Sequence, residues 1–151
     1  MDINIQFQAL LKERNFPMQV TEEEEQFVYK GRLSISNNFF VDFAASLMKG
    51  DGETPGQIVF QNIASMAEDE TREQWLEWLN QLNLYHSLYY YFASEVDGKV
   101  FARYVTQVAH VEDFFYILSK GGMVIRNAVA TLDNLRAKSG PPSSQSWNIK
   151  Q

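Results

Sequence analysis

Hydrophobic positions at the start of the chain follow a helical period. One helical face collects the apolar residues Ile3, Phe7, Leu10 and Leu11. Asp2 stands where an N-cap residue belongs, because its short carboxylate can accept a hydrogen bond from a free backbone amide. The sequence Asn15-Phe16-Pro17 ends the helix, since the residue before a proline is pushed out of the helical region. The pattern predicts one helix between Asp2 and Asn15.

Four consecutive glutamates follow at positions 22–25. Adjacent carboxylates repel, so we interpret this run as a solvated loop or as the wet end of a strand. After Gln26 the period changes to alternation, with apolar side chains at odd positions from Phe27 to Ile35 and from Phe39 to Phe43. Asn37-Asn38 between these runs is a favourable turn pair. The pattern predicts two antiparallel strands joined by a tight turn, with Gly31 as a candidate bulge.

The loop from Lys49 to Gly56 contains three glycines and precedes a third strand predicted over Gln57–Ile63. It lacks the Gly-Lys-Ser/Thr ending of a phosphate-binding loop, so we interpret it as a hairpin loop. Thr71 then begins a second helix, because threonine followed three residues later by glutamine matches a capping box. Trp75 and Trp78 lie along the apolar side of this helix. Their helical spacing favours core anchors over a binding platform.

Two β-rich runs, Leu88–Val96 and Val100–Val108, flank Asp97-Gly98, which is a strong hairpin signal. Counting outward from a two-residue turn pairs Val96 with Lys99 and Phe92 with Arg103. A last helix is predicted after His110, with an apolar stripe from Phe114 to Leu135. Gly121-Gly122 within this stripe either permits close packing or breaks the helix in two.

These elements predict an α+β fold. It consists of a five-stranded antiparallel sheet with three helices, in the order α-β-β-β-α-β-β-α, and the helices chiefly cover one face. The chain has 151 residues, the size of one ordinary domain, which we assign to residues 1–138. The composition from Ser139 onward predicts a disordered tail over residues 139–151.

The charge and the rare residues exclude several kinds of function. A net charge of −6 lacks the basic excess that nucleic-acid binding needs. The absence of cysteine excludes thiolate zinc sites and iron–sulfur ligation. His86 and His110, with Glu112 and Asp113, are the residues from which a metal site can be imagined. They lack helical His-x-x-x-His spacing and a third neutral ligand, so we favour ordinary loop histidines. We therefore expect no catalytic residue, cofactor or metal.

The first residues lack the basic start and apolar core of a signal peptide. No stretch approaches the roughly 20 apolar residues that cross a bilayer. We therefore expect a cytoplasmic protein without a membrane partner.

The order of the elements, the strand Phe39-Phe40-Val41-Asp42-Phe43 and the Leu88–Val108 hairpin before a long helix resemble the YbjN-like family. More distantly, they resemble type III secretion chaperones. The resemblance covers Asp2 to about Lys138. It implies a twisted antiparallel sheet with helices packed on it and a non-enzymatic, protein-binding role. Secretion chaperones of this shape typically dimerise and hold an extended partner segment. No catalytic motif defines the family, so no functional residue is carried over.

The leading hypothesis is a protein-binding module, chaperone-like or a regulatory adaptor, which binds another protein and forms a homodimer. The alternative is a small-ligand sensor with a pocket between sheet and helices, and an enzyme ranks third. Pairing outward from Asp97-Gly98 places one candidate partner-binding set on a single face: Tyr90, Phe92, Phe101, Arg103 and Val105. Aromatic residues beside a guanidinium are typical of interface centres. The competing interpretation is that both hairpin faces are core, with Arg103 capping a carbonyl or an acid at the rim.

Overall fold

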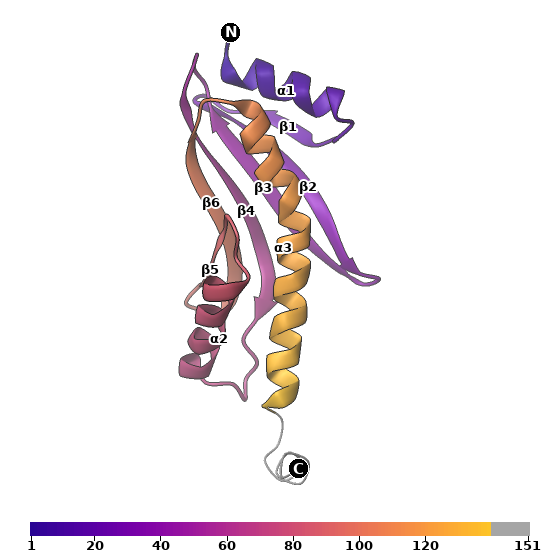
Figure 1. The fold of residues 1–151 in the computed structure, drawn as a ribbon, viewed down its shortest axis with the longest axis vertical. Coiled ribbons are helices and arrows are strands. Elements are labelled where there is room, and N and C mark those ends of the chain that lie inside the picture. Colours follow the sequence, from indigo (N-terminus) through magenta and orange to yellow (C-terminus); the bar gives the residue numbers. More distant parts are fainter. Residues whose placement is uncertain (140–151) are drawn as a thin grey trace.

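The structure of the chain is a computed structural model that describes residues 1–139. Most of the predicted tail, residues 140–151, therefore lies outside the described residues. Three helices and six strands follow one another in the described part, as Figure 1 shows: α1 (Ile3–Glu13), β1 (Gln19–Glu22), β2 (Gln26–Ser36), β3 (Phe39–Met48), β4 (Thr54–Ser65), α2 (Arg72–Tyr85), β5 (Tyr91–Ser94), β6 (Lys99–Val108) and α3 (Val111–Lys138).

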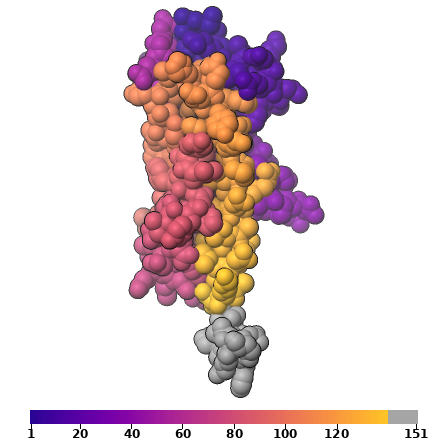
Figure 2. Space-filling view, in the orientation of Figure 1, coloured from indigo at the N-terminus to yellow at the C-terminus, as the bar shows by residue number. Residues whose placement is uncertain are grey.

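The six strands form one antiparallel sheet in the order β1-β2-β3-β4-β6-β5. The three helices lie on the same face of this sheet (Figure 1), and they cover most of that side in the space-filling view (Figure 2). The tip of the β2–β3 hairpin extends beyond α3 (Figure 1). The α+β class and the three helices are confirmed, and within residues 1–139 one face of the sheet is covered by helices and the other carries none.

The predicted strand number and element order are wrong, because the sheet has a sixth strand and the order is α-β-β-β-β-α-β-β-α. The missed strand is β1, whose four residues are all exposed. Val20 is its single apolar residue, so no alternation marks it, and Pro17 lies just before it. Backbone pairing with β2 holds β1 in place, with Gln19 opposite Lys30 and Glu22 opposite Phe27. An edge strand without buried side chains leaves no hydrophobic signal.

The predicted register of the last hairpin is wrong by one residue. Tyr91 pairs with Arg103 and Phe92 pairs with Ala102. The connection is a three-residue loop, in which the N–H of Glu95 donates to the carbonyl of Lys99 at 2.7 Å. Gly98 has a φ of +89°, the left-handed conformation that such a loop requires at its last position. A slip of one residue exchanges the two faces of a strand, so the predicted faces are redistributed.

Strand β5 is also shorter than the predicted run from Leu88 to Val96. Leu88 has a φ of +48°, and the N–H of Tyr90 donates to the carbonyl of Ser87 at 2.8 Å. These residues therefore form a turn after α2, and the hydrophobic run is divided between this turn and the strand.

Helix α3 continues without a break through Gly121-Gly122. A Cβ atom on Gly121 would lie 2.3 Å from Cζ of Phe60, so glycine lets the helix approach the sheet at this point. Next to it, the hydroxyl of Tyr90 donates to the carbonyl of Ile117 at 2.8 Å. Of the two interpretations of the glycine pair, close packing is the one that the structure shows.

Both predicted helix caps are present. The carboxylate of Asp2 accepts from the N–H of Asn4 at 2.7 Å, and the hydroxyl of Thr71 accepts from the N–H of Gln74 at 3.1 Å. Trp75 and Trp78 are buried, as expected for core anchors. The bulge predicted at Gly31 is absent there, because the register shift of β2 and β3 lies between Ser34 and Ser36. Gly31 instead makes room for the ring of Phe43, which lies opposite it.

Candidate protein-binding face

The side of the sheet that faces away from the helices is the candidate site. Alternation along the strands sends one set of side chains into the core and the other set to this side. We call it the open face and define it by these outward residues: Gln19, Thr21, Val28, Lys30, Arg32, Asp42, Ala44, Ser46, Met48, Gln57, Val59, Gln61, Tyr91, Lys99, Phe101, Arg103 and Val105. Val105 is 54% exposed and Tyr91 43%, so large apolar groups on this face meet solvent.

The two central strands form the floor of a trough. Their outward residues include Ala44 and Ser46 on β3 and Val59 on β4, which are short and half-buried. One cross-strand row passes from Lys30 through Ala44 and Val59 to Arg103. Lys30 and Arg103 are separated by three interstrand spacings, about 14 Å between backbones. Two long basic side chains therefore stand on either side of the short Ala44 and Val59 in this row, and we call this arrangement the trough.

The β6 side of the trough is held by a polar network. The guanidinium of Arg103 donates to Oε1 of Gln57 at 3.0 Å and to the hydroxyl of Tyr91 at 3.3 Å. Gln57 lies on β4 and Tyr91 on β5, so the arginine bonds to both neighbouring strands. Its positive charge is retained, because both partners are neutral. The hydrogen bond also directs the side chain of Gln57 toward Arg103 on β6.

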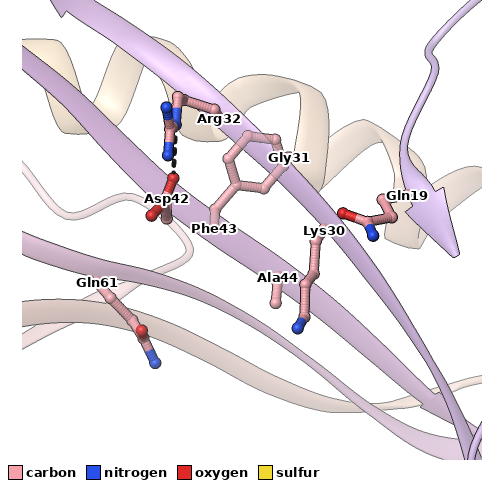
Figure 3. A pocket seen from close by; sticks show the side chains of 8 residues that line it. All are labelled: Gln19, Lys30, Gly31, Arg32, Asp42, Phe43, Ala44 and Gln61. Carbon is pink, nitrogen blue, oxygen red and sulfur yellow. Dashed lines mark hydrogen bonds and ion pairs between the residues drawn. The ribbon is translucent and has the colours of Figure 1, made fainter. Parts of the chain in front are cut away.

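The β2 side of the trough carries two cations. Arg32 pairs with Asp42 at 2.9 Å and lies 5.8 Å from the ring centre of Phe40. The side chain of Lys30 has no hydrogen-bond or ion-pair partner among residues 1–139. Figure 3 shows its ammonium group pointing away from the Arg32–Asp42 pair. Lys30 is therefore the cation on this side that is free to meet an anionic group.

The open face is hollowed at both ends of the trough. A hollow of about 660 Å³ lies where β3 and β4 separate, between Lys30, Ala44 and Gln61 (Figure 3). A second hollow of about 150 Å³ lies at the other end, beside Met48 and Val105. The separation follows from the register, because pairing of β3 with β4 stops at Phe43 opposite Phe60. The trough thus extends beyond the paired segment in both directions.

Charge on the open face differs in sign from that of the whole chain. Four of the 13 basic residues stand at its outward positions, and one of the 19 acidic residues does. The basic ones are Lys30, Arg32, Lys99 and Arg103, and the acidic one is Asp42. The chain as a whole has a net charge of −6. Most of the negative charge is therefore outside the strands of the open face, and its nearest concentration is Glu23, Glu24 and Glu25, which lie beside Met48 at one end.

The five residues predicted to bind a partner do not share a face. Tyr90 and Phe92 lie on the covered side and are 4% and 3% exposed. Phe101, Arg103 and Val105 lie on the open face, Phe101 and Arg103 half-buried and Val105 exposed. The three-residue loop causes this division, because it shifts β5 by one position relative to β6.

Sequence reasoning missed Lys30, Arg32 and the floor residues Ala44 and Val59. The alternation of β2 contained a signal for Lys30 and Arg32, since both fall at even positions between apolar odd ones. Nothing in the alternation shows that the three helices leave this side of the sheet uncovered. That fact depends on contacts between distant segments.

Two other places considered as functional sites are a hollow near the start of α3 and the two histidines. A hollow between the sheet and the start of α3, beside Tyr104, His110 and Phe114, has a volume of about 190 Å³. Small-molecule sites usually measure about 300–1,000 Å³. His86 follows the end of α2 and His110 precedes α3. Over residues 1–139, no three histidine, aspartate or glutamate side chains come together as metal ligands.

No family model, curated protein or solved structure matches the chain. The resemblance to the YbjN-like family and to secretion chaperones therefore stays a prediction. What the fold and the site define is a class of architecture, an antiparallel six-stranded sheet with three helices on one side and an open face on the other. In the part of the chain that the structure describes, no helix has the length and apolar character needed to span a membrane.

Proposed function

We propose that the chain is a non-enzymatic protein-binding module, chaperone-like or a regulatory adaptor, and that it holds another protein on the open face. One observation carries this proposal. Val59, Val105 and Tyr91 form an uncovered apolar surface around an arginine that is held in place by Gln57. Aromatic residues and arginine are enriched at the centres of protein interfaces. Contiguous exposed apolar surface on a folded domain commonly marks an interaction site.

The shape of this surface favours a macromolecule over a small ligand. The two hollows are open to solvent at the ends of a broad floor that crosses several strands. A small ligand needs a concave site that encloses most of its surface. A protein surface can instead cover the whole floor and remove its apolar groups from water.

Site-specific photo-crosslinking in living cells tests the proposal. A photoreactive amino acid at Val59 reports on the open face, and the same residue at Met123 on α3 reports on the helix side. Met123 is 47% exposed, so it is a matched accessible control. We expect a discrete crosslink to a different protein from position 59 and no crosslink to a different protein from position 123. Crosslinks of equal yield from both positions, or from position 123 alone, would contradict the proposal.

We further propose that the protein is a homodimer and acts in the cytoplasm. Light scattering over a range of concentrations tests the first statement, and cell fractionation tests the second. A monomer mass at every concentration would contradict the homodimer. Both proposals are independent of which face binds the heterologous partner.

A further inference from the structure

We infer that the trough binds an amphipathic helix with acidic flanks, supplied by the partner protein. This inference rests on the proposed function and adds the chemistry of the partner. It is carried by three features of the open face, which are the width of the trough, its length and the charge of its two sides.

The width fits one helix. Lys30 and Arg103 stand about 14 Å apart across the floor. A helix with its side chains measures about 10–12 Å across. The floor residues Ala44, Ser46 and Val59 are short, so a helix can lie close to the sheet between the longer side chains. A single extended strand occupies about 4.8 Å and would leave one side of the trough without contact.

The length fits a short helix. β3 and β4 are paired from Phe43 opposite Phe60 to Leu47 opposite Gly56. Five residues of antiparallel strand span roughly 14 Å, which equals about two and a half turns of helix. The hollows beside Lys30 and beside Met48 extend the floor at each end. The apolar stripe of the partner helix therefore needs about three turns.

The cations of the trough determine which charge the flanks of the partner helix should carry. Lys30 stands on one side of the trough, beside Arg32, which is already paired with Asp42, and Arg103 stands on the other side. Lys30 is free among residues 1–139, and Arg103 bonds only to neutral groups there. A helix whose apolar stripe has glutamates on both sides would place carboxylates near both sets of cations. Complementary charge of this kind fixes orientation and speeds association.

The same charges argue against a second copy of this chain on the open face. A two-fold axis would bring two such faces together, so that the unpaired Lys30 and Arg103 of one copy lay against a face that carries the same two unpaired cations. Like charges placed opposite each other at an interface disfavour the complex. The occupant is therefore a different, acidic protein segment.

Three designed peptides of about 18 residues test the inference by fluorescence anisotropy. The first has leucine and alanine on one helical face and glutamates on both flanks. The second carries lysines in place of the glutamates, and the third has the composition of the first in an order that destroys the apolar stripe. We expect saturable binding of the first peptide alone. We expect that binding to weaken as sodium chloride rises from about 50 mM to about 300 mM, because salt screens exposed charges.

Two variants locate the site. Lys30→Gln combined with Arg103→Gln removes a cation from each side, and we expect binding to weaken about tenfold, from about threefold for each exposed ion pair. Val59→Arg fills the floor and should abolish binding. Lys12→Gln is the matched control, since Lys12 is exposed on α1 and carries the same charge. We expect it to bind like the wild type, and thermal melts check that every variant is folded.

Equal binding of the lysine peptide would overturn the charge assignment, and equal binding of the reordered peptide would overturn the helix. Equal losses in Lys12→Gln and in the double variant would overturn the location. Crosslinks from Val59 in cells without binding of the acidic helical peptide would refute this inference and leave the proposed function standing. Absence of crosslinks from Val59 would remove the proposed function as well.

Discussion

The two faces of the β5–β6 hairpin contain similar residues and have different surroundings. Tyr90, Phe92 and Ala102 face the helices and are buried. Tyr91, Phe101 and Val105 face the open side, where Val105 and Tyr91 are exposed. Hydrophobicity alone therefore does not distinguish core from surface here. The position of each residue relative to the loop decides its face, because side chains alternate along a strand.

The largest expected effect is a difference in stability between matching substitutions on the two faces of the hairpin. Phe92→Ser removes a buried ring from the covered face and should lower the free energy of unfolding by about 3–5 kcal/mol. Phe101→Ser makes the same chemical change on the open face and should cost less than about 1 kcal/mol. Urea denaturation followed by tryptophan fluorescence measures both. Similar losses in the two variants would show that both hairpin faces are core.

The second prediction concerns the contact between α3 and the covered face. Gly121→Ala should lower the free energy of unfolding by about 1–3 kcal/mol, because the added methyl group overlaps the ring of Phe60. Gly122→Ala is the matched control. Its new Cβ would lie 3.3 Å from the ends of Arg126 and Leu33, which are side-chain atoms able to move. Its stability should stay within about 1 kcal/mol of the wild type, because alanine favours helix. If both alanines are equally tolerated, the helix does not need Gly121 to approach the sheet.

The third prediction tests how α1 is attached to the covered face. Burial alone would raise the pKa of Asp2. Hydrogen bonds from the N–H groups of Asn4 and Gly50, together with the charge of Lys49, outweigh it and hold this pKa below its ordinary value of 3.8. A carboxylate with a lowered folded-state pKa stabilises the protein above the pKa of the unfolded chain, and it loses this contribution as the pH falls through its folded pKa.

Asp2→Ala should therefore lower the free energy of unfolding at pH 7 by about 1 kcal/mol, the typical value of an N-cap. The difference from the wild type should shrink as the pH falls through the lowered pKa of Asp2, because the wild-type carboxylate then becomes protonated. Denaturation at several pH values measures this, and Glu53→Ala serves as a control at an exposed carboxylate of the neighbouring loop. A difference that is constant with pH would show that the charge of Asp2 does not contribute.

The smallest expected effect on stability belongs to the open face. Val105→Ser should change the melting temperature by less than about 2 °C, since surface substitutions usually stay within about 0.5 kcal/mol. The same variant should reduce crosslinking from position 59, because it removes exposed apolar surface beside the trough. A large loss of stability would place Val105 in the core of the monomer.

The parts of the fold that sequence predicts are those with local causes. Asp2 and Thr71 cap helices through bonds to residues two and three positions away, so their sequence context is sufficient. Strand β1 has no local cause, because its residues are exposed and it is held by backbone pairing with β2 and by the ion pair of Glu22 with the distant Lys49. The hairpin register depended on the choice between a two-residue and a three-residue loop, and Asp97-Gly98 is compatible with both.

The candidate site was less predictable than the fold for a related reason. Arg103 was identified because its neighbours are aromatic, but its companions Lys30 and Val59 come from strands far away in the sequence. Their proximity depends on the strand order β2-β3-β4-β6. The uncovered state of the face depends on three helices that all cross to the other side, which no single segment encodes.

The side chain of Asn83 on α2 has a consequence for assembly. Its amide donates to the carbonyl of Phe92 at 2.9 Å and accepts from the N–H of Phe92 at 2.7 Å, as a neighbouring strand would. An incoming strand must displace this amide before it can pair with β5. At the opposite edge, no side chain of residues 1–139 bonds to the backbone of β1 in this way. Endless growth of a sheet from copy to copy requires two free edges on each molecule. With the β5 edge blocked at Phe92, edge-to-edge pairing is expected to use β1, and such pairing ends at two copies.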